Sequence, residues 1–255
     1  MPHILITNDD GIHAEGLHAL VEGLRGLGTI SISAPTRERS AAAQSLTLRQ
    51  PIICERRGEN KWAVEGTPAD AVIVALHKLL PEPPDLVVSG INRGANMGEN
   101  VYYSGTIGAA REATIHNIPA IAMSLACRGF TDVNFQDSAR FARALAQIIL
   151  KEGLPSEVLL NVNVPQNWTG GVQFVRQSKK ITRNALQEGT DPRGRLYFWL
   201  HEQQIDQEMD PQTDYAAVRD GAIAVTPLHL DHTHMTSLNH LSHWAKQLEG
   251  AMKEK

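Results

Sequence analysis

Short apolar runs alternate with amphipathic segments along the chain as far as Pro165. Apolar runs that stop at turn residues are typical of buried strands in a parallel sheet, whereas apolar residues three and four positions apart are typical of helices. The pattern predicts these strands: Ile4–Thr7, Thr29–Ala34, Asp85–Ser89, Pro119–Leu125 and Val158–Val164. The helices predicted among them are Ala14–Leu27, Pro68–Leu80, Ser104–Asn117 and Phe135–Leu150. This alternation predicts an α/β fold with three αβα layers, Rossmann-like and doubly wound around a mostly parallel sheet.

One segment interrupts the alternation. Residues 48–64 have the pattern of a hairpin that turns at Gly58-Glu59-Asn60. Directly after it, Thr67 and Asp70 have the spacing of a capping box, with Pro68 at the first helical position. Helix capping is a sufficient explanation for this second motif.

The pattern changes after Gly170. Strands are expected at Val172–Thr182, Arg195–His201 and Gly221–Val225, with no helix before Ser237–Met252. We therefore expect a Rossmann-like domain over residues 1–170. Residues 171–255 would form a β-rich extension with a C-terminal helix. Such appendages often mediate self-association, so the hypothesis for this one is a homodimer or homotetramer.

Composition narrows the classes of function. The chain has 255 residues, of which 42% are hydrophobic and 20% charged, which is ordinary for a globular protein. A formal net charge of -4 offers no electrostatic footprint for a nucleic-acid duplex. No apolar run reaches membrane-spanning length, and the first strand begins too early for a signal peptide. The expectation is a cytoplasmic protein that binds no membrane and no duplex.

Two adjacent carboxylates, Asp9 and Asp10, follow the first predicted strand. Ligand sites in open α/β sheets lie just beyond the carboxyl ends of the strands. Like charges at close range repel strongly, so a divalent metal bound by hard oxygen ligands is one explanation. A plain turn is the other, because Asn-Asp-Asp-Gly is also good turn chemistry. The dipeptide alone leaves both open.

A second candidate is the small-residue segment Ser104–Ala110 at the start of a predicted helix. Backbone N–H groups at a helix N-terminus are a usual means of holding a phosphate, although a plain N-cap by Ser104 or Thr106 is the simpler alternative. The sequence contains neither a dinucleotide fingerprint after a strand nor a phosphate-binding loop with its Gly-Lys pair. A metal beside a phosphate cradle predicts phosphoryl chemistry.

Six blocks of sequence, in order along nearly the whole chain, resemble the signatures of the SurE family. They are Thr7–Gly11, Pro35–Ser40, Gly66–Asp70, Ser89–Gly94, Tyr103–Thr106 and Thr226–Asp231. The resemblance implies a survival-protein nucleotidase, a metal-dependent phosphatase of nucleoside 5′- and 3′-monophosphates that could also cleave short polyphosphate. It implies one divalent ion per subunit, Mg²⁺ or Mn²⁺. The implied metal ligands are Asp9, Asp10, Ser40 and Asn92, and the implied phosphate contacts are Asn96, Ser104, Gly105 and Thr106.

Two mechanisms stay open at this stage. Water assisted by the metal could attack phosphorus in line, with Asp9 orienting that water as a base, or a covalent aspartyl-phosphate could form on Asp9 or Asp10. The alternative function is a non-catalytic metal- or phosphate-binding stress protein. The histidine-rich end, residues 229–243, could support it, but its spacing matches no zinc pattern. A receiver-like phosphorelay module is disfavoured because no acceptor Asp ends the strand at 85–89.

Overall fold

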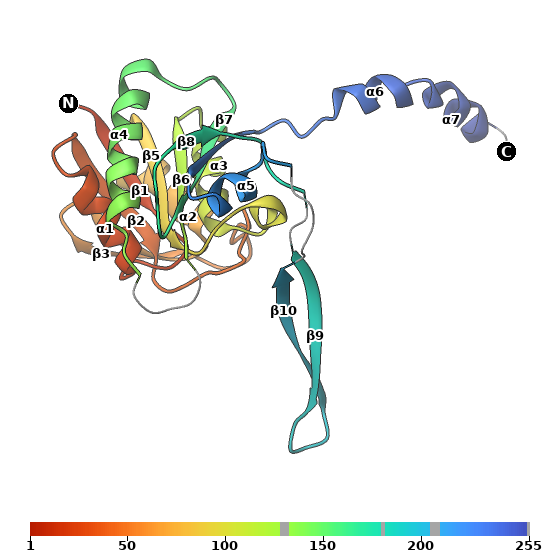
Figure 1. The fold of residues 1–255 in the computed structure, drawn as a ribbon, viewed down its shortest axis with the longest axis horizontal. Helices are drawn as coiled ribbons and strands as arrows, with labels where there is room; N and C mark the ends of the chain where they lie inside the picture. Colours follow the sequence, from red (N-terminus) through yellow and green to blue (C-terminus); the bar gives the residue numbers. More distant parts are fainter. Residues whose placement is uncertain (128–132, 180–181, 205–209, 254–255) are drawn as a thin grey trace.

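Nine of the strands in the described part of the chain form one sheet, which carries helices on both faces (Figure 1). The computed structural model describes residues 1–127, 133–179, 182–204 and 210–253. The order across the sheet is β3-β4-β2-β1-β5-β6-β7-β11-β8. The strands of this sheet are β1 (His3–Thr7), β2 (Thr29–Pro35), β3 (Ile53–Gly58), β4 (Lys61–Glu65), β5 (Leu86–Arg93), β6 (Ala120–Ala126), β7 (Val158–Pro165), β8 (Val172–Phe174) and β11 (Ile223–His229).

The central strands are parallel. β4, β2, β1, β5, β6 and β7 pair in parallel along the sheet, and β8 pairs in parallel with β11. Only the β3–β4 and β7–β11 pairs are antiparallel within this sheet. The predicted mostly parallel α/β sheet is confirmed, and so is the hairpin with its turn after Gly58.

Helices cover the two faces of the sheet in pairs. They are α1 (Glu15–Leu24), α2 (Pro68–Val74), α3 (Gly105–Ile115) and α4 (Gln136–Glu152). Alternate residues of β1 serve the two faces: Ile4 and Ile6 pack into the cluster with α1 and α4, and Leu5 packs into the cluster with α2 and α3. These two hydrophobic layers fix the sheet between its helices, as the αβα prediction requires.

Strand β5 is longer than predicted. It was expected to end at Ser89, but it continues to Arg93 through an irregularity between Ser89 and Asn92. The backbone conformation at this point requires a glycine. The φ of Gly90 is 134°, and a Cβ there would lie 2.3 Å from the carbonyl oxygen of Met123. Pairing with β6 therefore overrides the turn propensity of the glycine-rich sequence. The helix predicted to reach Leu80 changes to a π-helical turn at Ala75–Leu79.

Beyond residue 170 the expected elements are only partly correct. β8 ends at Phe174, and a separate strand, β9 (Thr182–Thr190), pairs with β10 (Leu196–Gln204). The predicted strand over 172–182 is therefore wrong, and its residues 180–181 lie outside the described ones. A short helix, α5 (Asp214–Arg219), was not predicted. Because β11 and β8 extend the main sheet, the sheet continues past residue 170; the domain division there stays a prediction.

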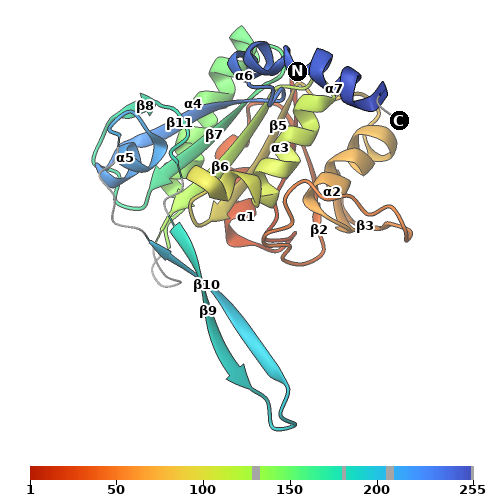
Figure 2. The same cartoon turned by 90° about the vertical axis from the view of Figure 1, so that its right-hand side faces the viewer.

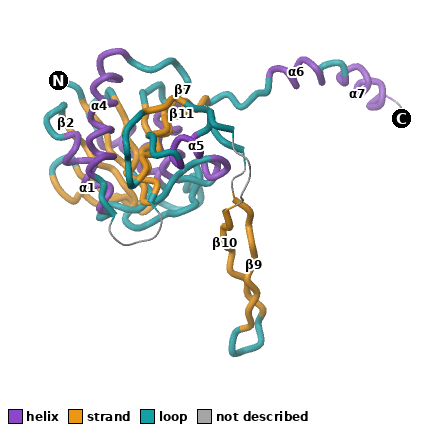
Figure 3. Tube along the Cα trace, in the orientation of Figure 1, coloured by secondary structure: helices purple, strands orange, loops and turns teal. Residues whose placement is uncertain are grey.

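Two segments project from the αβα body (Figure 1), and one of them, a hairpin, is also seen to project in Figure 2. The projecting hairpin is β9–β10, and the tail is α6 (Met235–Leu241) with α7 (Trp244–Lys253). Figure 3 shows the hairpin as an isolated pair of strands and the tail as two successive helices. No residue of α6 or α7 is buried. None of the helices in the described residues is long and apolar enough to cross a membrane.

Candidate metal and phosphate site

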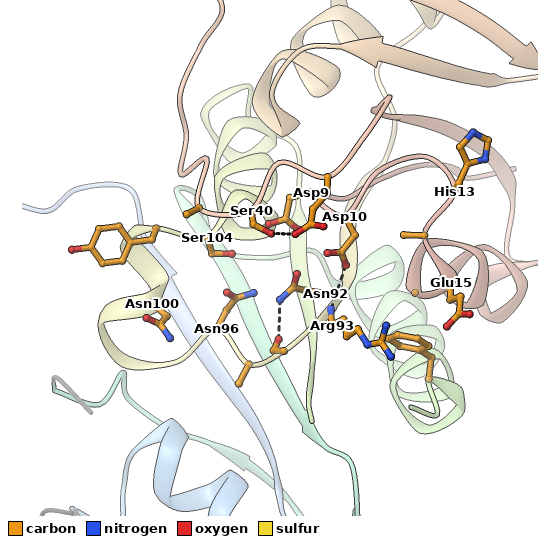
Figure 4. A pocket seen from close by; sticks show the side chains of 18 residues that line it. Asp9, Asp10, His13, Glu15, Ser40, Asn92, Arg93, Asn96, Asn100 and Ser104 are labelled. Carbon is orange, nitrogen blue, oxygen red and sulfur yellow. Dashed lines mark hydrogen bonds between the residues drawn. The ribbon is translucent and has the colours of Figure 1, made fainter. Parts of the chain in front are cut away.

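A cavity of about 660 Å³ opens where β1 and β5 end, and it brings together most of the predicted site residues (Figure 4). Six of the eight lie on its wall: Asp9, Asp10, Ser40, Asn92, Asn96 and Ser104. The other lining residues are His13, Ala14, Glu15, Gly16, Glu38, Ala41, Arg93, Gly94, Ala95, Asn100, Tyr103 and Phe135. The remaining two, Gly105 and Thr106, lie directly behind Asp9.

Asp9 is almost completely buried, with 5% of its surface exposed. The Thr106 hydroxyl donates to Asp9 Oδ1 at 2.5 Å. Burial raises the pKa of the Asp9 carboxyl, and the hydrogen bonds from Thr106 and the start of α3 oppose that rise. The N-terminal end of α3 therefore holds the Asp9 carboxylate in one orientation.

Gly105 is what allows α3 to approach Asp9 so closely. A Cβ at this position would lie 2.9 Å from Asp9 Cβ and 3.0 Å from Asp9 Oδ2. Any side chain there would have to displace the carboxylate. The role of Gly105 is thus defined by Asp9; its direct contact with a phosphate, and that of the fully buried Thr106, stay predictions.

Asp10 lies beside Asp9 and is partly buried. The backbone N–H of Arg93 donates to Asp10 Oδ2 at 3.3 Å, so the end of β5 positions this second carboxylate. Burial, with the neighbouring charge of Asp9 as the next cause, raises the pKa of Asp10 to about 6. A cation between the two carboxylates would relieve that repulsion.

The segment Asn8–Gly11 forms a turn and also presents the acidic pair, so the two alternatives considered for this sequence are compatible. Asn8 Oδ1 accepts from the Gly11 backbone N–H, and Asn8 Nδ2 donates to the Gly11 carbonyl. Gly11 has a φ of 101° and packs against the backbone of Arg37. The turn therefore directs Asp9 and Asp10 toward the cavity while its own polar groups are satisfied.

Ser40 reaches the cavity on the loop that follows β2. The Arg39 backbone N–H donates to the Asp9 carbonyl at 2.7 Å, and the Ser40 hydroxyl donates to Glu38 Oε1 at 2.5 Å. Farther along, Gln44 Nε2 donates to Glu112 Oε2 at 2.7 Å, which ties the loop to α3. These contacts fix Ser40 next to the acidic pair.

The predicted capping box is present, and it has a second function. Thr67 accepts from the Asp70 backbone N–H, and Asp70 Oδ2 accepts from the Thr67 backbone N–H. The same carboxylate also accepts from Thr47, from its N–H at 3.0 Å and from its hydroxyl at 2.6 Å. Capping alone was therefore an incomplete explanation, because Asp70 also anchors the end of the Ser40 loop.

Asn92 and Asn96 come from the segment that leaves β5. Asn92 Nδ2 donates to the Gly94 carbonyl at 2.8 Å, and Figure 4 shows its amide directly beside the two aspartates. Asn96 is buried: its Nδ2 donates to Ser124 Oγ, its N–H donates to Asn163 Oδ1, and Asn161 donates to its carbonyl. These hydrogen bonds tie the segment after β5 to β6 and β7.

Ser104 is the N-cap of α3, as its sequence position suggested. Its hydroxyl accepts from the Ile107 backbone N–H at 3.2 Å, and it lines the cavity while remaining largely buried. The helix start thus has two tasks, to cap α3 and to bound the cavity beside Asp9.

The chemistry of the donors fits a hard divalent cation. Asp9, Asp10, Ser40 and Asn92 offer two carboxylates, a hydroxyl and an amide oxygen on one cavity wall. No group of three His, Cys, Asp or Glu side chains that could hold a metal ion is found in the described residues.

Sequence reasoning missed several cavity residues. Glu38, Arg93 and Tyr103 line the cavity although only their blocks, and not their roles, were singled out. His13, Glu15 and Phe135 lie in or beside predicted helices and gave no chemical signal. Their position next to loops that follow β1 and β5 could have indicated them, because such loops meet at one sheet edge.

Comparison with known proteins shows the family of this chain. The model of the family described as "Survival protein SurE" matches residues 4–184. This chain belongs to the SurE family. A protein named 5′-nucleotidase SurE from Syntrophotalea carbinolica is 46% identical over 242 residues, which span 95% of this chain and 97% of that protein. One of the same name from Geobacter sulfurreducens is 46% identical over 245 residues, covering 95% and 93%.

A solved structure of a SurE protein has the same fold. The crystal structure of the SurE protein from Aquifex aeolicus superposes with a TM-score of 0.85 at 35% identity. The match covers 96% of this chain and all of that chain. The αβα architecture is therefore that of the SurE family, and the similarity extends well beyond the cavity.

Proposed function

We propose that this SurE-family chain is a metal-dependent 5′-nucleotidase, which hydrolyses nucleoside monophosphates to nucleoside and phosphate. One observation carries the proposal: the adjacent carboxylates Asp9 and Asp10 share a cavity wall with the oxygen donors of Ser40 and Asn92. The relatives named 5′-nucleotidase SurE, matched along nearly their whole length, support it.

We assign Asp9, Asp10, Ser40 and Asn92 to one Mg²⁺ or Mn²⁺ per subunit, because hard oxygen donors suit these ions. When bound, the ion supplies charge neutralisation and Lewis acidity at the phosphate. Asn96 and Ser104 line the same cavity, and we assign them to the phosphate oxygens.

Asp9 is the residue that we propose to manage the proton. The Thr106 hydroxyl donates to its Oδ1 and fixes the carboxylate, which we assign as the base that accepts a proton from an attacking water. In the competing route, Asp9 or Asp10 attacks phosphorus itself and forms an aspartyl-phosphate.

The experiment is phosphate release from a panel of 5′- and 3′-nucleoside monophosphates and short polyphosphate, with Mg²⁺, Mn²⁺ or EDTA. Wild-type protein should release phosphate only with a divalent ion, and Asp9→Asn should lower the rate by at least about 100-fold. Asp137→Asn, on the surface of α4, is the matched control and should match the wild type.

The panel also decides the finer assignments. Cleavage of 3′-monophosphates or of polyphosphate would extend the activity as the family resemblance implies. No release from any substrate with any divalent ion would contradict the proposal and favour the non-catalytic binding protein. A trapped aspartyl-phosphate would replace direct attack by water with the covalent route.

We further propose that the chain forms a homodimer or homotetramer through the projecting hairpin and the tail. Both carry exposed apolar side chains: Leu186, Leu196, Tyr197, Phe198, Trp199 and Leu200 in the hairpin, and Met235, Leu238, Leu241, Trp244, Leu248 and Met252 in the tail. Contiguous apolar surface of this kind is typical of protein–protein interfaces. The location in the cytoplasm stays a prediction.

A further inference from the structure

The cavity is far larger than a phosphate requires. Its volume of about 660 Å³ is in the range of pockets that enclose a whole small-molecule ligand. Figure 4 shows Asn96, Asn100 and Ser104 on one side of the aspartates, and His13 and Glu15 on the other. Since the phosphate would occupy the middle, one of these two ends has room for the nucleoside.

Three aromatic rings line the cavity among the described residues: His13, Tyr103 and Phe135. Phe135 is 8% exposed and belongs to the hydrophobic cluster with α1 and α4, so its ring faces have protein partners. Tyr103 is 57% exposed. His13 is exposed as well, but it lies on the other side of the aspartates from Ser104 (Figure 4). Of the exposed rings in the described lining, Tyr103 is therefore the one beside the predicted phosphate contact.

The backbone presents the Tyr103 ring from a fixed point. The Tyr103 N–H donates to the Asn100 carbonyl at 3.1 Å, and the Tyr103 carbonyl accepts from the Ala43 N–H at 2.9 Å. The next residue is Ser104, the cavity-lining N-cap of α3. In a nucleoside monophosphate one ribose separates phosphate from base, so a base near Tyr103 is consistent with a phosphate near Ser104.

We propose that Tyr103 is a specificity-determining residue that stacks on the nucleobase of the substrate. The inference rests on the proposed nucleotidase function and deepens it, because it distinguishes nucleoside monophosphates from sugar phosphates. Base–aromatic stacking tolerates any base, since every base has a π-face, and purines offer the larger area. Tyr103 thus confers a preference for a base, strongest for purines.

The chain supplies a matched control. Tyr102 is also 57% exposed, directly adjacent in sequence, and does not line the cavity. Replacement of either tyrosine by Ala removes the same ring from the same short segment. Only loss of the Tyr103 ring should change recognition of the base.

The test is a comparison of KM and kcat for AMP, CMP and ribose 5-phosphate, with saturating Mn²⁺. Tyr103→Ala should raise KM for AMP by about five- to 100-fold, raise KM for CMP less, and leave kcat and the KM for ribose 5-phosphate unchanged. Tyr103→Phe, which keeps the ring, should retain the wild-type KM, and so should Tyr102→Ala.

Four results would overturn the inference while the nucleotidase function stands. They are equal wild-type KM values for AMP and ribose 5-phosphate, an unchanged KM for AMP in Tyr103→Ala, an equal rise for both substrates, and a base-selective loss in Phe135→Leu instead. A wild-type protein that hydrolyses none of the three substrates would instead contradict the proposed function. A Tyr103→Leu variant, with unchanged thermal midpoint, repeats the measurement if the alanine variant fails to fold.

Discussion

Asp9 and Asp10 are neighbours in sequence but differ in their surroundings. Asp9 is buried and fixed by Thr106 and the start of α3, whereas Asp10 is partly exposed and receives one backbone N–H from Arg93. Environments that differ in this way give chemically identical side chains different tasks. We therefore expect Asp9 to handle the proton and Asp10 to serve mainly as a charge for the cation.

The raised pKa of Asp10 predicts a pH-dependent stability of the metal-free protein. Because the folded-state pKa of about 6 lies above the unfolded value, the native state binds the proton more tightly. Stability therefore falls as pH rises from about 4 to about 6, and this loss is complete above that range. Asp10→Asn removes the free-energy cost of ionising Asp10 in the folded protein. This variant should be more stable than wild type by roughly 2–3 kcal/mol at pH 8 in EDTA.

Denaturant unfolding at pH 4 and pH 8 checks this prediction. The advantage of Asp10→Asn should be present at pH 8 and small at pH 4, where Asp10 is protonated in the folded state and only about half ionised in the unfolded state. Saturating Mn²⁺ at pH 8 should reverse the order, because only the wild type keeps both carboxylates. An equal advantage at both pH values would mean that the charge of Asp10 is not its cause.

At this scale the sequence alone indicated some residues and not others. Asp9 and Asp10 follow an apolar run and are adjacent, so periodicity and charge repulsion indicate them. Ser40 and Asn92 have no such signature, because a serine in a turn and an asparagine in a loop are ordinary there. Only the family resemblance selected them, and the structure adds that both line the same cavity.

Among the elements, α3 has the closest relation to the candidate site. Its first residue, Gly105, touches Asp9, and its N-cap Ser104 bounds the cavity. In the first turn of the helix, Gly108 lets the Ser40 loop approach, since a Cβ there would lie 2.2 Å from the Ala43 carbonyl oxygen. The small residues that suggested a phosphate cradle thus also serve close packing of backbone against backbone.

Gly105→Ala should separate this packing role from helix propensity. Alanine normally stabilises a helix relative to glycine by up to about 1 kcal/mol. Here its Cβ would displace Asp9, so we expect at least about a tenfold loss of phosphate release together with lower thermal stability. Gly250→Ala in α7, which has open space around it, is the control.

The control variant should keep full activity and gain helix stability. Phosphate release and the thermal midpoint of both variants decide the matter. Wild-type activity in Gly105→Ala would show that Asp9 tolerates displacement and that the close approach of α3 is dispensable.

Sequence reasoning was most accurate for the elements buried on both faces. β1, β6 and β7 appeared as apolar runs because a strand between two helical layers needs apolar residues on both sides. The extension of β5 to Arg93 depends on its pairing with β6, which local propensity does not contain. For the same reason the short helix α5 escaped prediction, since only a six-residue segment packs against β11 and β7.

In the whole molecule, the αβα body and the projecting segments differ in how they treat apolar side chains: the body buries them, and the projecting segments expose them. The body buries its apolar side chains in two layers. The projecting hairpin has apolar residues at successive positions of β10, so both of its faces are apolar and exposed. An isolated two-stranded hairpin is marginally stable in water, which favours coverage by another copy of the chain.

Replacing Phe198 and Trp199 together by Asp should weaken self-association. Charges on both faces of the hairpin would have to be buried in any interface formed there. Light scattering should show a mass that falls from a multiple of 28.0 kDa toward that value. Thr190→Asp, an exposed polar position on the same hairpin, should leave the mass unchanged. A wild-type mass of one chain would contradict the oligomer.

The polar network around Asn96 has a consequence for the order in which the molecule is made. Most of the cavity wall comes from residues 9–104, which leave the ribosome first. Asn96, however, is held by Asn161 and Asn163 of β7, which emerge much later. A nascent chain thus cannot complete this wall until β7 has joined the sheet, and the apolar hairpin follows only after that. Because synthesis proceeds from the N-terminus, the complete cavity wall and the exposed apolar hairpin both appear only when the parallel core can already form.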